Sequence, residues 1–170
     1  SAPLRGKKGS EYEGGVRVPF IAAWAKPDAK NKFQKKYPIA QNAIQLQQGT
    51  VMDLYPTILS VADINIPKHY ALDGSDLKKL FQGKKDKKHR NDFLMHFPHG
   101  EHRANYFTTY RKGDWKLIYY YNPETSNTPS WQLYNLKEDP FEETDLAKSN
   151  PQITRKMIKT MLKQLEAEKA

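Results

Sequence analysis

From residue 92 onward the chain alternates short apolar runs with polar or glycine-containing turns. The runs are rich in aromatic and β-branched residues, the side chains that fit best on the pleated surface of a sheet. They cover residues 93–97, 106–110, 115–121 and 131–135. Arg111-Lys112-Gly113-Asp114 separates the second run from the third, which predicts a hairpin. The sequence therefore predicts a four-stranded antiparallel sheet in the C-terminal half of the chain.

One amphipathic helix is predicted after the last of these runs. Asn150 fits the N-cap position and Pro151 the first helical position, where the missing N–H of proline costs little. Apolar side chains then recur on one face at helical spacing. They are Ile153, Met157, Ile158, Met161, Leu162 and Leu165. Such a stripe usually packs against a core, so we expect this helix to cover one face of the sheet.

The N-terminal half shows a different pattern. Residues 18–24 form an apolar run that suits a strand buried on both faces, as in an α/β sheet. A lysine-rich loop follows, and apolar residues then recur at helical spacing over residues 54–62. Asp53 is the expected N-cap of this helix, because Pro56 would then fall in the first turn. The change of pattern predicts two unequal parts.

A glycine-rich run that carries two lysines lies close to the N-terminus. It reads Gly6-Lys7-Lys8-Gly9-Ser10-Glu11-Tyr12-Glu13-Gly14-Gly15-Val16-Arg17-Val18-Pro19. Its glycines let the backbone approach a ligand closely, and Lys8 is a compact point charge that suits sulfate or phosphate oxygens. Lys7 is an adjacent alternative, and we expect Glu13 and Arg17 to pair around the turn. The competing interpretation is a surface loop whose lysines contact only water.

Charge is unevenly distributed along the chain, whose formal net charge is +9. Lysine and arginine cluster at residues 26–36 and 84–90, between predicted elements, so solvated loop charge is the simplest interpretation of both clusters. A basic surface also suits a polyanion, and charge alone does not separate a sulfated glycan from nucleic acid. The absence of cysteine excludes a disulfide framework and a cysteine nucleophile within this chain. No stretch approaches the ~20 apolar residues that a transmembrane helix needs.

A second group of polar side chains follows the first predicted strand, at His96-Phe97-Pro98-His99-Gly100-Glu101-His102-Arg103. Histidine and glutamate are common metal ligands, but this spacing fits no standard zinc arrangement and predicts a turn. We therefore expect no metal here. His96, His99, His102 and Arg103 are instead candidates to donate hydrogen bonds to sugar hydroxyls, carboxylates or sulfates. The alternatives are a loop of exposed histidines and a partly buried His96 satisfied on its strand.

Taken in order, these segments resemble the type I sulfatases, the arylsulfatase and glycan sulfatase family of the alkaline phosphatase superfamily. The N-terminal run resembles the family's Gly-Lys-Gly-(Ser/Thr)-x-Tyr-Glu-Gly-Gly-x-Arg-x-Pro block, although many relatives have glycine where this chain has Lys7. Residues 111–118 resemble its Arg-x-Gly-Asp-Trp-Lys-Leu-Ile hairpin, and residues 133–147 resemble the Leu-Tyr-(Asp/Asn)-Leu-x-x-Asp-Pro tail and its continuation. Similar blocks lie at residues 53–59 and 72–80.

The resemblance implies an α+β fold in two parts. Residues 1–70 correspond to the end of the large α/β catalytic domain of a sulfatase. Residues 71–170 correspond to the small C-terminal subdomain, a four-stranded antiparallel sheet packed by a C-terminal helix. The chain would then be the C-terminal piece of a larger enzyme, and residues 18–24 would expose apolar surface for lack of sheet neighbours. Partial unfolding of residues 1–70 or self-association of the fragment is expected to follow.

The resemblance also implies an activity. Sulfatases hydrolyse sulfate esters with a formylglycine made from a Cys or Ser in a (Cys/Ser)-x-Pro-x-Arg motif, and a calcium ion held by Asp and Asn neutralises the sulfate. It implies that both belong to the region upstream of residue 1, so we expect this chain alone to be inactive. Lys8 matches the lysine that contacts the sulfate, which makes it the catalytic residue in this chain. His96, His99, His102 and Arg103 match a segment that faces the cleft in many glycan sulfatases, which would bind a sulfated carbohydrate.

By the same analogy the full-length enzyme is periplasmic or extracellular, with no membrane span and no nucleic-acid partner. Two other functions stay open at this point. One is a free-standing basic module that binds nucleic acid or a sulfated polyanion through residues 84–90. The other is a phosphate- or phosphonate-ester hydrolase of the same superfamily, whose anion sites are similar.

Overall fold

The computed structural model describes residues 2–67, 69–98, 106–123 and 129–167. Two compact units divide the chain: Ser1–Pro19 joins Asp92–Ala170 in the first, and Phe20–Asn91 forms the second. The N-terminal run therefore packs with the C-terminal sheet, and not with the residues that directly follow it. The boundary predicted at residue 70 concerns the domains of a larger enzyme and stays a prediction.

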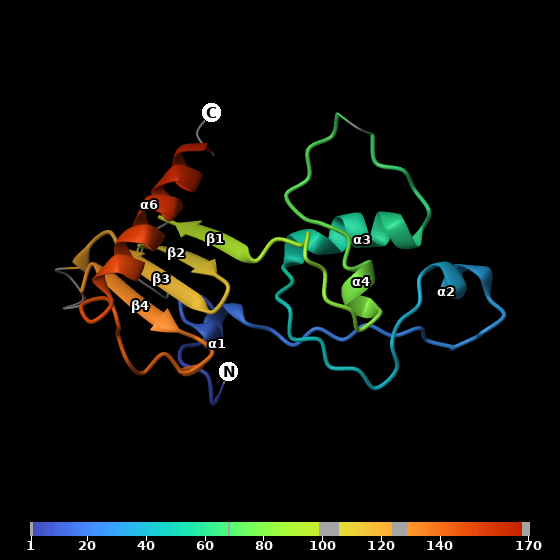
Figure 1. Cartoon of the computed structure of the whole chain (residues 1–170), viewed down its shortest axis with the longest axis horizontal. Helices are drawn as coiled ribbons and strands as arrows, with labels where there is room; N and C mark the ends of the chain where they lie inside the picture. The colour runs from blue at the N-terminus through green and yellow to red at the C-terminus, as the bar shows by residue number, and fades with distance from the viewer. Residues whose placement is uncertain (1, 68, 99–105, 124–128, 168–170) are drawn as a thin grey trace. The chain divides into compact units, whose positions relative to one another are not determined.

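The described residues of the first unit form a four-stranded antiparallel sheet, as predicted (Figure 1). Its strands are β1 (Asp92–Phe97), β2 (Phe107–Lys112), β3 (Trp115–Tyr120) and β4 (Trp131–Asn135). Their order in space equals their order in the sequence, and every neighbouring pair is antiparallel. Gly113 has φ +58° in the tight turn between β2 and β3, the predicted hairpin.

One face of the sheet packs against α6 (Pro151–Ala167), which begins at the predicted proline. A row of apolar side chains crosses this face at one level of the register: Leu94, Tyr110, Leu117 and Leu133. Met157 and Met161 of α6 are buried against this row. Leu162, predicted to lie on the apolar stripe, is instead 47% exposed. The helix therefore covers the sheet with a narrower stripe than the sequence suggested.

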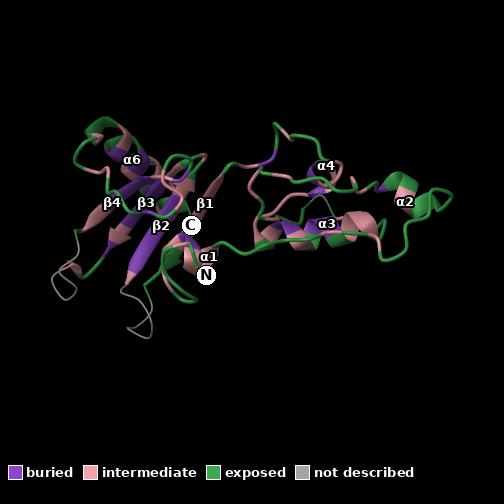
Figure 2. Cartoon of the chain, turned by 90° about the horizontal axis from the view of Figure 1, so that it is seen from below, coloured by how far each residue is buried: buried purple, intermediate pink, exposed green. Residues whose placement is uncertain are grey.

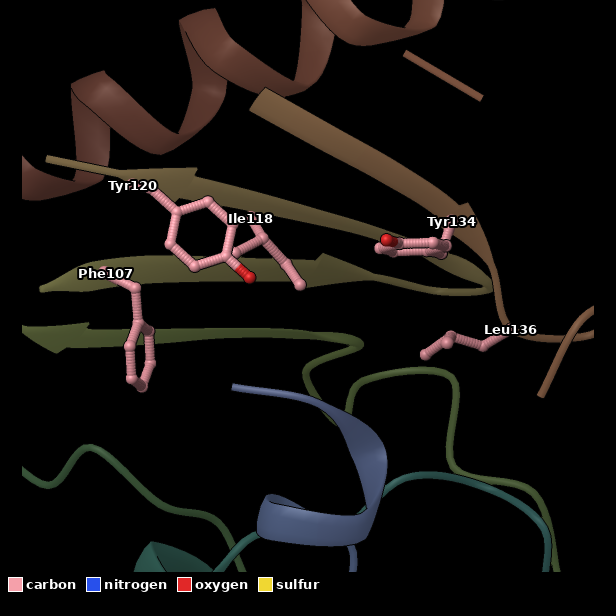
Figure 3. Packing of buried hydrophobic residues seen from close by; sticks show 5 residues of the cluster. All are labelled: Phe107, Ile118, Tyr120, Tyr134 and Leu136. Atoms are coloured by element: carbon pink, nitrogen blue, oxygen red, sulfur yellow. The ribbon is translucent and has the colours of Figure 1, made fainter. Parts of the chain in front are cut away.

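The opposite face of the sheet carries a second cluster, made of Phe107, Ile118, Tyr120, Tyr134 and Leu136. Tyr12 from the N-terminal run packs against it, next to the short helix α1 (Glu13–Val16). Figure 3 shows these side chains, with α6 on one side of the sheet and the N-terminal helix on the other. Each face of the sheet thus has its own covering element.

The second unit contains short helices and irregular segments. Its elements are α2 (Lys32–Lys36), the 3-10 helix η1 (Val51–Asp53), α3 (Leu54–Val61) and α4 (Lys78–Phe81). Tyr37, Leu77 and Leu80 are the buried hydrophobic residues of this unit.

Asp53 occupies the N-cap position of α3, as predicted, but its side chain makes no capping hydrogen bond to that helix. Thr50 occupies the N-cap of η1, whose last residue, Asp53, lies inside the first turn. The Asp53 carboxylate accepts hydrogen bonds from the backbone N–H of Thr50 at 2.7 Å and of Ser75 at 2.8 Å. The Asp53 side chain therefore forms a capping box with Thr50 at the start of η1, and it is fully buried.

The strand predicted over residues 18–24 does not form; the backbone there is irregular. A strand needs a neighbour for its backbone hydrogen bonds, and among the described residues no strand pairs with this segment. Val18, Phe20 and Ile21 are 75%, 57% and 88% exposed, so the predicted exposed apolar surface is present. Figure 2 shows that buried residues concentrate in the strands of the first unit.

Candidate functional site

The loop that carries Lys8 is a tight turn. The backbone N–H of Ser10 donates to the carbonyl of Lys7 at 2.9 Å, and the N–H of Lys7 donates to the Ser10 hydroxyl at 3.2 Å. Gly9, directly after Lys8, has φ +91°, a conformation that favours glycine. The Lys7–Lys8 pair is therefore presented at the tip of a hydrogen-bonded turn.

The paired glycines let this turn lie directly on α1. A Cβ atom at Gly15 would come within 2.2 Å of the Ser10 carbonyl oxygen and 2.8 Å of that of Lys7. The backbone N–H of Gly14 donates to the carbonyl of Arg5 at 2.7 Å and closes the base of the loop. Larger residues at these two positions would push the lysine turn away from the helix.

The side chains of Lys7 and Lys8 are both exposed. Within the described residues neither ammonium group has a hydrogen-bond or ion-pair partner. Because no carboxylate of the described residues neutralises these two ammonium groups, they are available to bind an anionic ligand. The geometry presents both lysines, and the assignment of the sulfate contact to Lys8 stays a prediction.

Glu13, at the start of α1, anchors the turn to the sheet through buried charges. Its carboxylate lies 3.1 Å from the Lys116 ammonium on β3 and 3.3 Å from the Arg111 guanidinium on β2. The same Lys116 ammonium lies 2.8 Å from the carboxylate of Glu142. The side chains of Glu13, Lys116 and Glu142 are 3%, 2% and 0% exposed, so these charges are withdrawn from water.

Glu142 holds both ends of the lysine loop. Its carboxylate accepts the backbone N–H of Glu13 at 2.6 Å, and its carbonyl accepts Nη1 of Arg5 at 2.6 Å. Its own backbone has φ +56°, a region that non-glycine residues rarely adopt. Burial raises the pKa of the Glu142 carboxyl, against the opposing effect of the Lys116 cation. The buried Glu142 thus binds both ends of the loop from residue 5 to residue 13.

A second contact involves Tyr120 on β3. Its hydroxyl donates to the carboxylate of Glu11 at 2.5 Å and lies 3.1 Å from the Tyr12 hydroxyl. Burial, followed by the charge of Glu11, raises the pKa of Tyr120. The phenol therefore stays protonated and keeps its hydrogen bond to the N-terminal run.

The predicted pair between Glu13 and Arg17 is wrong. Arg17 is exposed, and Glu13 instead turns inward to Lys116 and Arg111. Sequence reasoning missed Lys116 and Glu142 altogether. One signal was available: strand alternation puts Lys116 on the same face as the apolar Ile118, and a lysine on a core-facing position needs a carboxylate partner.

His96 lies on β1, as predicted, and is exposed. Its Nδ1 lies 2.8 Å from the Thr108 hydroxyl, which is also 2.9 Å from the hydroxyl of Tyr121. Both contacts of the His96 ring with described residues, to Thr108 and Tyr121, use Nδ1, so Nε2 is the ring nitrogen left for a ligand. His99, His102 and Arg103 lie outside the described residues, and their substrate role stays a prediction.

The structure does not bring His96 and the lysine turn to one face of the sheet. His96 pairs with Thr108 in the register and shares the α6 face with Leu94. The N-terminal run packs on the other face, where Tyr12 meets the cluster that includes Met95. A single small ligand therefore cannot be assigned to both from the contacts of this chain.

Arg5 joins the N-terminal run to other parts of the first unit. Its guanidinium lies 3.9 Å from the centre of the Tyr12 ring, donates to the Glu142 carbonyl, and lies 3.3 Å from the Tyr134 hydroxyl on β4. Arg5 thus serves to hold the N-terminal run in place.

The basic cluster at residues 84–90 is only partly a solvated loop. Its lysines, at 84, 85, 87 and 88, are exposed, as the simplest interpretation predicted. His89 is instead buried, with Nδ1 2.7 Å from the Ser75 hydroxyl and Nε2 3.0 Å from the carbonyl of Gln48. His89 therefore anchors the loop that carries the lysines.

The described residues show neither a cluster of metal ligands nor a membrane-spanning helix. No group of three or more His, Asp or Glu side chains there is arranged to hold a metal ion. No helix in the described ranges has the length and apolar character to cross a membrane.

This chain is similar to sulfatases of known sequence. The family described as "N-sulphoglucosamine sulphohydrolase, C-terminal" matches residues 7–170. A sulfatase of Formosa agariphila is 32% identical in an alignment of 163 positions that covers 89% of this chain and 26% of the relative. The N-acetylgalactosamine-6-O-sulfatase of Bacteroides thetaiotaomicron is 26% identical in an alignment of 162 positions that covers 90% of this chain and 28% of the relative.

A solved structure supports the same similarity. The crystal structure of Ps i-CgsB matches with a TM-score of 0.70 at 25% identity, over 96% of this chain and 32% of that one. The chain thus spans 26% to 32% of the length of these three relatives. The match includes the predicted architecture, a four-stranded antiparallel sheet with a C-terminal helix.

Proposed function

Because this chain belongs to the sulfatases, as a member of the N-sulphoglucosamine sulphohydrolase C-terminal family, we propose that it supplies the sulfate-binding cation of a sulfuric ester hydrolase. The observation that carries the proposal is the turn at Lys8. Its ammonium group is exposed and has no partner in the described part of the chain, while the turn is anchored to buried charges. Lys7 is the neighbouring candidate.

The chemistry of a sulfate ester explains why a cation is needed. Negative charge grows on the leaving and sulfuryl oxygens as the S–O bond breaks. A fixed ammonium group beside these oxygens stabilises that charge more than it stabilises the substrate. Loss of one such group typically costs about 10²- to 10³-fold in rate.

The substrate we propose is a sulfated sugar or glycan. Support comes from the relatives, since the family description and the Bacteroides relative both name sulfated amino sugars. Within this chain, His96 offers an exposed ring on β1; because it lies on the sheet face opposite the lysine turn, we propose that it contacts a more distant hydroxyl or sulfate of a longer glycan. His99, His102 and Arg103 follow it in the sequence and are proposed to extend the same contact. A free-standing nucleic-acid module gains no support from family membership.

The sulfatase family suggests a catalytic cofactor, and we propose the formylglycine and calcium of this family for the full-length enzyme. The described residues of this chain do not fit a calcium site, since no acidic cluster of the needed size is present among them. We therefore assign the ligands and the nucleophile to the N-terminal catalytic region of the same protein. The proposed location is the periplasm or the extracellular space.

The test is the substrate range of the intact gene product, produced with its maturation system. Sulfated mono- and disaccharides are compared with phosphate and phosphonate monoesters of the same alcohols. Turnover of sulfate esters, with loss of activity in Lys8→Ala, supports the proposal. Turnover of only the phosphate or phosphonate esters contradicts it and favours the related hydrolases of the superfamily.

A further inference from the structure

We infer that Glu13, Lys116 and Glu142 form a buried anchor that positions the Lys8 turn for the reaction. The inference rests on the proposed function, because it assigns a catalytic consequence to the position of Lys8. Glu13, Lys116 and Glu142 are assigned as positioning residues, which act through Lys8 and do not contact the substrate. Two of them, Lys116 and Glu142, come from distant parts of the sequence.

The anchor controls both ends of the lysine loop. On the N-terminal side the Arg5 guanidinium donates to the Glu142 carbonyl at 2.6 Å. On the C-terminal side the backbone N–H of Glu13 donates to the Glu142 carboxylate at 2.6 Å. The backbone N–H of Gly14, the residue after Glu13, donates to the Arg5 carbonyl at 2.7 Å and joins the two ends of the loop directly. The loop between them has little freedom to move relative to the sheet.

Lys116 makes this arrangement possible. Its ammonium group sits between two carboxylates, 3.1 Å from Glu13 and 2.8 Å from Glu142. Without this cation the two buried carboxylates would repel each other, and the charge of Glu13 already acts to raise the pKa of Glu142. Arg111 reaches Glu13 from the partly exposed side, at 3.3 Å, and would compensate only in part. Removal of Lys116 is therefore expected to move Glu13 away from Glu142.

Stability alone does not account for the anchor. Replacing a buried ion cluster with apolar residues of similar volume is often neutral or stabilising. The sheet already has an apolar cluster on each face. What a charge cluster adds is one fixed position of the N-terminal run on the sheet, because each carboxylate oxygen has a defined partner. A fixed position matters for a turn whose cation must meet a reacting group, since a displacement of ~1 Å can cost about 100-fold in rate.

The test is a set of substitutions in the intact gene product, assayed on a sulfated sugar that the wild type hydrolyses. Lys116→Met is expected to lower kcat/KM about 10- to 100-fold, mainly through kcat, and Lys116→Arg is expected to restore most of it. In a Lys8→Ala background, Lys116→Met is expected to cause no further loss. A positioning residue acts through Lys8, whereas simple destabilisation lowers activity in both backgrounds. Wild-type kcat/KM in Lys116→Met, or losses that multiply in the double variant, would overturn the inference.

Hydrogen exchange of the same proteins provides a measurement that does not depend on activity. Lys116→Met, and the milder Glu142→Gln, are expected to speed exchange at the amides of residues 7–15 more than at the amides of β2 and β3. Lys137→Met, which removes an exposed lysine, is the matched control and is expected to change neither. Unchanged exchange at residues 7–15 in both anchor variants would overturn the anchor alone. Full activity of Lys8→Ala would instead overturn the proposed function, and with it the catalytic consequence of the anchor.

Discussion

The Lys116 ammonium lies 3.1 Å from the Glu13 carboxylate, although 103 residues separate them. This contact joins two sequence blocks that resemble sulfatases, the N-terminal glycine-rich run and the Arg-Lys-Gly-Asp-Trp-Lys hairpin. Glu142 adds a third block, from the segment that follows Asp139-Pro140. Three of the five blocks that carry the resemblance therefore meet at one buried cluster, which holds the turn that carries Lys8.

Loss of Lys116 is expected to destabilise the first unit. Lys116→Met leaves two buried carboxylates without their cation, which typically costs about 3–5 kcal/mol of unfolding free energy. Urea unfolding followed by tryptophan fluorescence measures the change, since Trp115 and Trp131 lie in the sheet. The exposed Lys137→Met is the control and is expected to change stability by less than about 0.5 kcal/mol. A loss below about 1 kcal/mol in Lys116→Met would contradict the burial of this charge.

The stability contributed by Glu142 is expected to fall as the pH rises. Burial raises the folded-state pKa of this carboxyl above its ordinary 4.5, so the folded protein binds the proton more tightly than the unfolded chain. Between pH 4.5 and the raised pKa, the unfolding free energy attributable to Glu142 therefore decreases with pH. The difference in unfolding free energy between wild type and Glu142→Gln, measured across this range, should favour the wild type most at the acidic end. A difference that grows with pH would show that Lys116 outweighs burial.

Local pattern was enough to predict the C-terminal architecture. The strands and α6 form where aromatic, β-branched and periodic apolar residues indicated them, because each of these elements finds its partners within the same unit. The segment at residues 18–24 has an equally apolar sequence but no strand beside it in the described residues, so composition alone gave the wrong element.

The anchor below Lys8 could not be predicted in the same way. Glu13 had a cation four positions away at Arg17, and local spacing favoured that pair. Its real partners are Arg111 on β2 and Lys116 on β3, and spacing along the sequence gives no reason to prefer these residues to Arg17. The sequence did identify the lysine turn itself, since glycine and lysine act there through local backbone geometry.

The apolar segment at residues 18–24 is expected to make this chain self-associate. Ile21 is 88% exposed, and Phe20 is still 57% exposed although its ring stacks on Phe81. Sedimentation velocity should show concentration-dependent association, which Ile21→Lys reduces. Ala29→Lys adds the same charge at an exposed position outside the run and is expected to have no effect. Equal association of all three proteins would rule out this segment as the contact.

His96 is expected to contribute to sugar binding in the intact gene product. His96→Ala removes a ring nitrogen available for a hydrogen bond, which is worth about 0.5–1.5 kcal/mol and corresponds to a roughly 3- to 10-fold higher KM. His69→Ala, an exposed histidine of the second unit, is the matched control. Steady-state kinetics on a sulfated sugar measures both. An unchanged KM in His96→Ala would remove this residue from the substrate site.

The central claim is that Lys8 binds the sulfate group, and the most direct measurement is kcat/KM of the intact gene product with Lys8→Ala and Lys7→Ala. Both lysines are exposed on the same turn, so each variant controls for the other. Lys8→Ala is predicted to lose about 10²- to 10³-fold with its fold retained, and Lys7→Ala to stay near wild type. Wild-type turnover in Lys8→Ala, or the large loss in Lys7→Ala alone, would contradict the assignment.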